Sequence, residues 1–238
     1  MKKKILLLLL ATIALLPVRA QIGEPRTAIA IGVNGGISMN TIGFDPTIKQ
    51  KLLIGPTLGA TLRITSEKYF KTLCALQLEV NYSQLGWNED IMNNQSVALP
   101  DTYQRKMDYI QLPMLARLAW GYEKKGAMFY FLAGPQIGFC FNEKSERSDI
   151  WTTTPGGTPD RPNNMFAQYD MPIDHKFDYG ITAGLGVELN TKIGHFMIDG
   201  RYYYGLSDIY KNGKKDVFSR SNHGTIIAKF TYLIDLRK

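Results

Sequence analysis

Apolar and polar residues alternate along most of this chain with a period of two, which is typical of a β-strand with one face in an apolar environment. In the segment AIAIGVNGGISM, for example, Ile29, Ile31 and Val33 alternate with Ala30 and Gly32. The same alternation recurs in eight segments, which comprise residues 28–39, 52–64, 72–84, 108–120, 127–141, 175–189, 196–209 and 224–236. The pattern therefore predicts eight β-strands, each with one apolar face.

The connections between these segments alternate in length. Short connections follow the second, fourth and sixth segments, at residues 65–71, 121–126 and 190–195. Long connections follow the first, third, fifth and seventh segments, at residues 40–51, 85–107, 142–174 and 210–223. Strands that run in one direction therefore all end in short connections, and strands that run in the other direction all end in long ones. All short turns lie on one side of the predicted sheet and all long loops on the other.

This arrangement favours a membrane barrel over a soluble β-sandwich. The segments have roughly 11–15 residues, whereas ordinary strands have about five or six and tilted membrane strands need about 9–11. Short periplasmic turns and long external loops are typical of outer-membrane barrels, and a sandwich gives no reason for this asymmetry. We therefore predict an all-β protein of the cell outer membrane: an eight-stranded antiparallel up-and-down transmembrane β-barrel with short periplasmic turns and long extracellular loops.

The N-terminal sequence MKKKILLLLLATIALLPVRAQ has the three parts of a secretory signal peptide. Three lysines precede an apolar run at residues 5–16, and Val18 and Ala20 fit positions −3 and −1 of a cleavage site. We expect residues 1–20 to be a signal peptide and residues 21–238 to form the barrel domain. Removal of residues 1–20 lowers the formal net charge from +7 to +3, so the basic composition does not indicate a nucleic-acid partner.

The polar faces of the predicted strands point into the bore, which in an eight-stranded barrel is only wide enough for side chains. Eight of these positions are charged: Arg63, Glu79, Arg117, Glu188, Asp199, Arg201, Lys229 and Asp235. Because an unpaired charge in a narrow, poorly hydrated space is costly, we expect these residues to form an ion-pair network that fixes the strand register. A gated polar conduit or a proton-linked site is the functional alternative for the same residues.

Aromatic residues gather near both ends of the predicted strands, as expected of aromatic girdles at the two membrane interfaces. The group near the short turns comprises Tyr69, Phe70, Trp120, Tyr122 and Phe196, and the group near the long loops comprises Tyr82, Trp87, Tyr103, Tyr109, Phe139, Phe141, Phe177 and Tyr204. The alternation also places Cys74 outward near the periplasmic end and Cys140 inward near the opposite end. Because a disulfide needs closely spaced Cα atoms, we expect two free thiols.

No motif in the sequence carries cofactor or metal chemistry. The segment GITAGLGVEL contains Gly184 and Gly186 at the first two positions of a dinucleotide-binding fingerprint, but Leu189 occupies the third and the predicted structure that follows is a strand rather than a helix. The three histidines lie near loops or turns without the spacing of metal ligands. We therefore expect no cofactor and no bound metal.

A lipid-modifying enzyme is the catalytic alternative, because some eight-stranded outer-membrane barrels use a histidine with a serine or acidic partner to modify lipid A. His223 lies near Ser219, Ser221 and Asp216 in the sequence, but without a defined catalytic spacing. We therefore predict that the protein is not an enzyme.

The long loops form the predicted working surface, because binding residues are concentrated on loops that a rigid scaffold positions. The loop at residues 142–174 contains Trp151 and the turn-rich segment TPGGTPDRP, and the loop before the last strand is locally basic. Candidate contact residues are Trp151, Lys214, Lys215 and Arg220. Outer-membrane lipid and anionic lipopolysaccharide are candidate partners of this basic surface.

Four motifs together resemble the PorT-like outer-membrane β-barrel family of Bacteroidetes. They are YIQLPMLARL at residues 109–118, LAGPQIGF at 132–139, FDYGITAGLGVEL at 177–189 and GRYYYGLSDIY at 200–210. Their order and spacing match over essentially the whole chain after residue 20. The resemblance implies an outer-membrane barrel and a role as an accessory component of type IX protein secretion, with other secretion proteins as partners and no catalytic residues.

Three hypotheses for the function follow from these observations. The first is a non-enzymatic outer-membrane barrel that assists protein secretion, as the PorT-like resemblance implies. The second is a general surface barrel that binds envelope or host ligands through its extracellular loops. The third is a lipid A-modifying enzyme.

Overall fold

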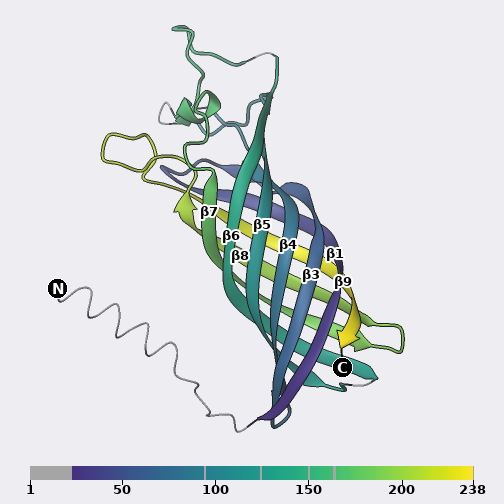
Figure 1. Ribbon diagram of the computed structural model, residues 1–238. Helices are drawn as coiled ribbons and strands as arrows, with labels where there is room; N and C mark the ends of the chain where they lie inside the picture. Colours follow the sequence, from purple (N-terminus) through teal and green to yellow (C-terminus); the bar gives the residue numbers. More distant parts are fainter. Residues whose placement is uncertain (1–22, 94, 124, 150, 163–164, 238) are drawn as a thin grey trace, which may run out of the picture.

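A computed structural model describes residues 23–93, 95–123, 125–149, 151–162 and 165–237 (Figure 1). The predicted signal peptide, residues 1–20, lies outside the described residues, so its cleavage remains a prediction. No helix in the described part of the chain is long and apolar enough to cross a membrane.

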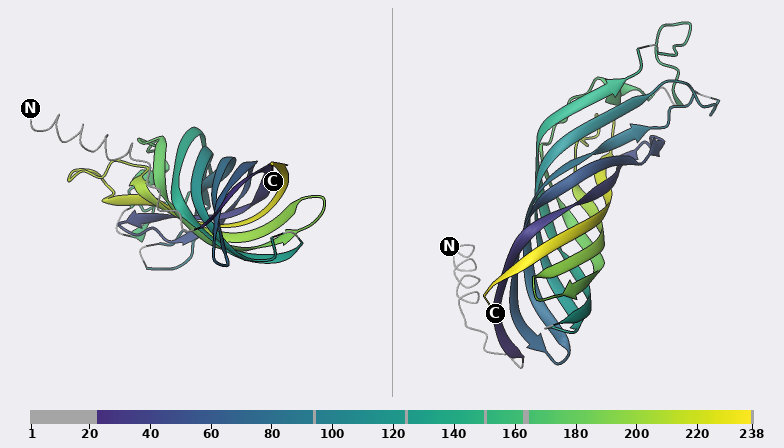
Figure 2. Two further views of the ribbon diagram at one scale, coloured as in Figure 1. Left: turned by 60° about the horizontal axis from the view of Figure 1, so that its bottom comes forward. Right: turned by 90° about the vertical axis from the view of Figure 1, so that its right-hand side faces the viewer.

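Eight long antiparallel strands close into a single barrel, which confirms the predicted fold class (Figures 1 and 2). In chain order the long strands are β1 (Glu24–Asp45), β3 (Leu53–Tyr69), β4 (Thr72–Glu89), β5 (Tyr103–Gly121), β6 (Gly126–Arg147), β7 (Phe177–Asn190), β8 (His195–Asp208) and β9 (Arg220–Arg237). Each long strand pairs with the next along the chain, and β9 pairs with β1 to close the barrel. A two-residue strand, β2 (Gln50–Lys51), adds to β4, and a 3-10 helix, η2 (Ala167–Tyr169), lies in the longest loop.

Several strands are longer than the alternation predicts, mostly on the long-loop side. The pairing of β5 with β6 continues to Tyr103 and Arg147, well beyond the predicted limits at residues 108 and 141. This extension rises above the rest of the barrel in Figure 1. Outside the bilayer a strand needs no apolar outer face, so its residues lose the alternation on which the prediction rested.

The outer wall of the barrel is apolar, as the alternation predicts. Large hydrophobic side chains are exposed on every long strand, including Val33, Ile54, Val80, Met114, Phe131, Leu185, Ile198 and Phe230. The alternating inward positions are buried and often polar, for example Asn34, Thr61, Asn81 and Thr182. This inside-out pattern is the one that a lipid solvent requires.

Two apolar clusters fill the two ends of the bore. The smaller one lies toward the short turns and includes Leu115, Tyr130 and Met197. The larger one lies toward the long loops and includes Trp87 and Tyr210. Ionic and hydrogen-bonding side chains occupy the space between them, so the barrel interior is a packed core.

Three residues of the predicted outer girdle are in fact inside the barrel. Trp87, Tyr103 and Tyr109 have essentially no exposed surface, whereas Phe141 and Phe177 on the same end of the barrel are about half exposed. The height of an aromatic residue along its strand indicates a girdle, but its parity decides whether the ring points outward or inward. Trp87 lies an odd number of residues from the lipid-facing Tyr82, so the alternation itself turns it inward.

Candidate functional site: the filled bore and the extracellular cap

The first ionic cluster in the bore is centred on Glu79 of β4. Its carboxylate lies 2.9 Å from the guanidinium of Arg201 on β8 and 2.8 Å from Lys229 Nζ on β9. Arg201 also pairs with Asp199, which accepts a hydrogen bond of 2.9 Å from the hydroxyl of Tyr130. These side chains come from strands on opposite walls, so the cluster ties the walls together through the middle of the bore.

The second ionic cluster lies nearer the short turns and is centred on Glu188 of β7. Arg63 Nη1 lies 2.8 Å from its carboxylate, and Arg117 forms a further ion pair with it. His195 bridges Glu188, at 2.8 Å, and Asp235, at 2.9 Å. The sequence prediction did not include His195, because a histidine beside a short turn gives no sign that it reaches back into the bore.

The two clusters bring together all eight charged residues that the sequence placed in the bore. Four are basic and four are acidic, so their formal charges balance. The guanidinium carbon of Arg117 lies 4.3 Å from the ring centre of Tyr130, and this contact joins the two clusters. A pocket of about 600 Å³ opens at the short-turn end and is lined by members of the second cluster, including Arg63, Glu188 and Asp235, so this cluster borders open space on that side.

Neutral and acidic groups continue this filling toward the long loops. His223 is fully buried, and its Nε2 lies 3.1 Å from the hydroxyl of Tyr109 on the facing side of the bore. Asp178 accepts hydrogen bonds from Tyr203 and Ser207. His223 therefore lies inside strand β9 rather than in a polar loop, and it has a structural partner. Among the described residues no three His, Cys, Asp or Glu side chains are grouped as metal ligands, and both cysteines are unbridged.

The long loops pack on the end of the bore and form what we call the extracellular cap; its described part comprises residues 46–52, 90–93, 95–102, 148–149, 151–162, 165–176 and 209–219. Its base is an aromatic cluster in which Phe44 contacts Trp87 at 5.2 Å and Phe218 at 5.0 Å between ring centres. Arg105 donates hydrogen bonds from this base to the carbonyl oxygen of Met171, at 2.6 Å, and to the Tyr210 hydroxyl, at 2.7 Å. The cap therefore packs on the barrel as a continuation of its core.

A buried ion pair holds the longest loop to the neighbouring one. Arg161 Nη2 lies 2.7 Å from Asp101, and both side chains are almost completely buried. The same guanidinium stacks at 4.7 Å over the ring of Trp151, which also contacts Tyr169 at 4.9 Å. No local pattern in the sequence marks Asp101 and Arg161 as partners, because they lie 60 residues apart.

A carboxyl group lies in a cavity of about 240 Å³ between three cap loops. Glu89 is 8 % exposed and accepts a hydrogen bond of 2.7 Å from the Tyr169 hydroxyl. Burial raises the pKa of Glu89 above its ordinary value, against the lowering effect of Tyr169, Gln168 and Arg161. Met92 and Met165 supply apolar walls, so the cavity combines a buried acid with adaptable apolar contacts.

The four predicted loop contacts do not form one surface. Trp151 is partly buried within the cap, whereas Lys214 and Lys215 are exposed in the last long loop and Arg220 is exposed at the start of β9. The structure therefore places a basic edge on the last long loop of the cap and gives Trp151 a packing environment. Their part in binding remains a prediction.

A closed β-barrel with an apolar belt, a filled bore and an ordered cap on one side defines an integral outer-membrane β-barrel protein. Comparison by sequence agrees with this class. Residues 19–211 match the family model described as outer membrane protein beta-barrel domain, and the chain belongs to that family. The protein is located in the outer membrane.

Solved structures with a similar arrangement are also outer-membrane or surface proteins, with 12–13 % sequence identity to this chain. Ail, the attachment invasion locus protein of Yersinia pestis, matches 89 % of this chain and 99 % of its own, with a TM-score of 0.35. OprG of Pseudomonas aeruginosa matches 89 % and 95 %, with a TM-score of 0.38, and Neisserial surface protein A matches 86 % and 96 %, with a TM-score of 0.35. No match was found among curated proteins.

Proposed function

We propose that this protein is a non-enzymatic outer-membrane barrel that acts by presenting its extracellular cap to a partner molecule. The observation that carries the proposal is the contrast between the two parts of the molecule. Ion pairs and apolar clusters cross the bore above the pocket at the short-turn end, and we infer that they block the passage of a solute, while the long loops pack on an aromatic base. In proteins of known function, binding residues are concentrated on loops that a scaffold positions in this way.

The resemblance to the PorT-like family supports a more specific form of this proposal, in which the partner belongs to the type IX secretion machinery. An eight-stranded barrel is too narrow to pass a folded cargo protein, so the role would be accessory. Deletion of the gene, followed by measurement of secreted protease in the culture medium, tests this role. We expect reduced secretion, restored by the full chain; normal secretion in the deletion strain would remove the secretion role and leave the cap as a surface for envelope or host ligands.

The contribution of the cap is tested in the same strain. A variant in which residues 149–166 are replaced by a short Gly-Ser linker keeps all eight long strands, so it separates loss of the longest cap loop from loss of the barrel. We expect it to insert into the outer membrane and to fail in complementation. Full complementation would place the working surface elsewhere. A lipid A mass spectrum of the deletion strain tests the enzymatic alternative, and we expect it to be unchanged.

A further inference from the structure

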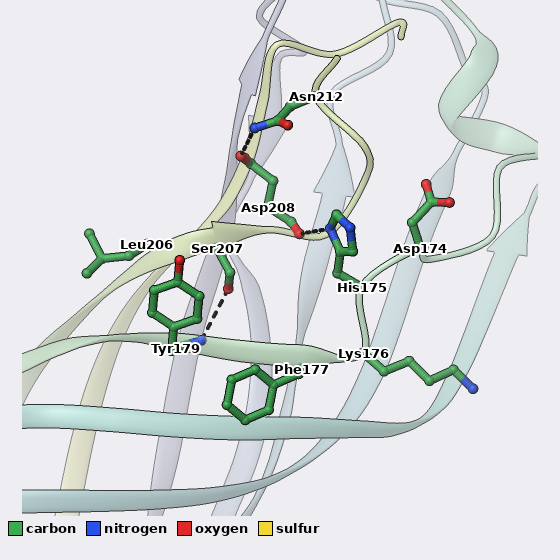
Figure 3. A pocket seen from close by; sticks show the side chains of 9 residues that line it. All are labelled: Asp174, His175, Lys176, Phe177, Tyr179, Leu206, Ser207, Asp208 and Asn212. Atoms are coloured by element: carbon green, nitrogen blue, oxygen red, sulfur yellow. Dashed lines mark hydrogen bonds between the residues drawn. The ribbon is translucent and has the colours of Figure 1, made fainter. Parts of the chain in front are cut away.

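The wall of the barrel is notched on its outer side where β7 and β8 diverge toward the long loops. The two strands pair only between Gly180↔Gly205 and Asn190↔His195. Above Gly180, β7 continues beside β6, while β8 meets β9 again at Asp208↔Asn222 after a break in register. The divergence leaves a pocket of about 540 Å³ (Figure 3).

The notch is closed toward the bore, so it is a recess in the wall and not a side passage. Its back wall is formed by Ser207, which donates a hydrogen bond of 2.5 Å to Asp178 and accepts one of 3.2 Å from the backbone N–H of Tyr179. Asp178 and Tyr203 behind it are buried. A molecule in the notch therefore comes from the outside of the barrel.

The lower part of the notch belongs to the surface that faces lipid. Phe177, Tyr179 and Leu206 are 54 %, 48 % and 50 % exposed, and they continue the apolar belt of the barrel. The rings of Phe177 and Tyr179 lie side by side, with 6.3 Å between their centres. Aromatic residues at this height mark the outer membrane interface, so hydrocarbon chains of the outer leaflet reach the lower part of the notch.

The upper part of the notch is polar and carries both hydrogen-bond donors and acceptors. Figure 3 shows His175, Asp208 and Asn212 above the two rings. His175 Nδ1 donates a hydrogen bond of 2.9 Å to the carbonyl oxygen of Asp208, and the Asn212 amide donates one of 2.9 Å to the Asp208 carboxylate. These bonds fix the polar rim in place above the apolar floor.

The surroundings of the rim are basic. Lys176 is exposed next to His175, Lys211 lies 3.4 Å from Asp174 at the edge of the notch, and Lys214 and Lys215 are exposed in the same loop as Lys211. Lysines next to a membrane surface attract anionic headgroups. Asp174 is exposed and Asp208 is partly buried, and both already accept hydrogen bonds from neighbouring groups. A carboxylate oxygen can accept more than one hydrogen bond, so with the lysines the rim offers partners for both sugar hydroxyl and phosphate groups.

We propose that this notch binds the headgroup of an anionic outer-leaflet glycolipid of the lipopolysaccharide type, with its acyl chains against Phe177, Tyr179 and Leu206. The ligand must combine hydrocarbon chains, hydroxyl groups and negative charge, because the site presents an aromatic floor, a mixed polar rim and a basic surround in this order from the membrane outward. The rim residues His175 and Asn212 belong to the lower edge of the cap, while the floor belongs to the barrel wall, so the site lies apart from residues 149–166. Its occupancy does not depend on the secretion role.

The test measures binding of diphosphorylated lipid A to the purified full-length mature protein in detergent, by native mass spectrometry. The variant His175→Ala/Tyr179→Ala removes one rim group and one floor group. The matched control Phe141→Ala/Lys144→Ala removes an equally exposed aromatic residue and a charged residue from β6 at the same end of the barrel. We expect binding to weaken at least tenfold in the first variant and to stay unchanged in the control.

Three further comparisons make the result decisive. Phosphatidylethanolamine should bind at least tenfold more weakly than lipid A, and free glucosamine phosphate should not compete, because it lacks hydrocarbon chains. If the double variant does not fold, the single variant His175→Ala replaces it, because His175 lies outside the strands. We expect this variant to show weakened binding of lipid A as well. Equal loss in the control, unchanged binding in both notch variants, equal affinity for phosphatidylethanolamine, or competition by the free sugar phosphate would overturn the proposal.

Discussion

The carboxylate of Glu79 and the guanidinium of Arg201 form an ion pair of 2.9 Å across the bore, between strands β4 and β8 that do not pair with each other. Both side chains are almost completely buried. Lys229 and Asp199 complete the cluster, so each charge in it has a partner of opposite sign. The barrel therefore has a crosslinked interior, which backbone hydrogen bonds between neighbouring strands cannot supply.

Removal of one member of this cluster should destabilise the barrel strongly. Arg201→Leu leaves Glu79 and Asp199 with only one buried cation, Lys229, and breaking a buried pair costs about 3–5 kcal/mol. We expect the unfolding midpoint in detergent to fall accordingly. Arg220→Leu, at an exposed position near the loops, is the control and should change stability by less than about 0.5 kcal/mol. An unchanged midpoint for Arg201→Leu would contradict a structural role of the cluster.

A double variant tests whether Glu79 and Arg201 act on each other. In Glu79→Gln/Arg201→Met the remaining charges, Lys229 and Asp199, are of opposite sign, so the excess charge left by Arg201→Met alone is absent. We expect the double variant to lose less stability than the sum of the single variants, by about 0.5–3 kcal/mol in a double-mutant cycle. Additive losses would show that the two residues are not coupled.

The inward position of Trp87 gives a prediction that distinguishes it from a girdle residue. Trp87→Ala should open a cavity in the aromatic base of the cap and cost about 3–5 kcal/mol. Phe141→Ala, which removes a half-exposed ring from the lipid face, should cost clearly less. Denaturant unfolding in detergent measures both losses, and equal losses would argue that Trp87 faces lipid.

The raised pKa of Glu89 predicts how the stability of the cap depends on pH. Because the folded state raises this pKa above its unfolded value near 4.5, the folded cap binds the proton more tightly, and stability falls as pH rises from the unfolded pKa to the folded one. Glu89→Gln removes the free-energy cost of burying a charged carboxylate, while the amide oxygen of Gln still accepts the hydrogen bond from the Tyr169 hydroxyl. We expect slower proteolysis of the cap loops at pH 7 in this variant, and no advantage below about pH 4.

A control keeps this reading specific to burial. Glu146 is exposed on the extension of β6, and Lys144 and Lys106 lower the pKa of its carboxyl group. Glu146→Gln therefore removes a charge whose ionised form is not disfavoured by burial. This variant should not slow proteolysis at pH 7. Faster cleavage of the cap in Glu89→Gln than in the unaltered chain would show that the charged form of Glu89 is stabilising.

The barrel itself could be predicted from the sequence because a lipid solvent imposes one face on every strand. Apolar residues such as Val33 occupy the outward positions of a strand, and polar or charged residues such as Arg201 occupy the inward positions. This difference alone indicates which face of each strand meets lipid. The ends of the strands could not be predicted in the same way. Beyond the bilayer the solvent no longer requires apolar outward side chains, so the extension that carries Tyr103 keeps alternate burial but has polar residues on its outer face.

The cap could not be predicted either, since its contacts join residues that are far apart in the chain. Asp101 and Arg161 form a buried pair, and Trp151 lies against Tyr169, but each residue alone is compatible with a solvated loop. His195 and His223 are similar cases, because their partners come from other strands. Trp87 is a different case: it lies beyond the predicted end of its strand at residue 84, and only the extension of β4 to Glu89 gives it an inward face.

The central claim is that the bore is filled and that the protein acts from its outer side. The most direct test is the ionic conductance of the purified mature protein in a planar lipid bilayer at neutral pH and high salt. We expect no conductance steps above the bilayer background, for the intact chain and equally for the variant without residues 149–166, because the ion pairs of Glu79 and Glu188 lie below the cap. Regular steps in the intact chain, or steps that appear when the cap is removed, would contradict a closed bore.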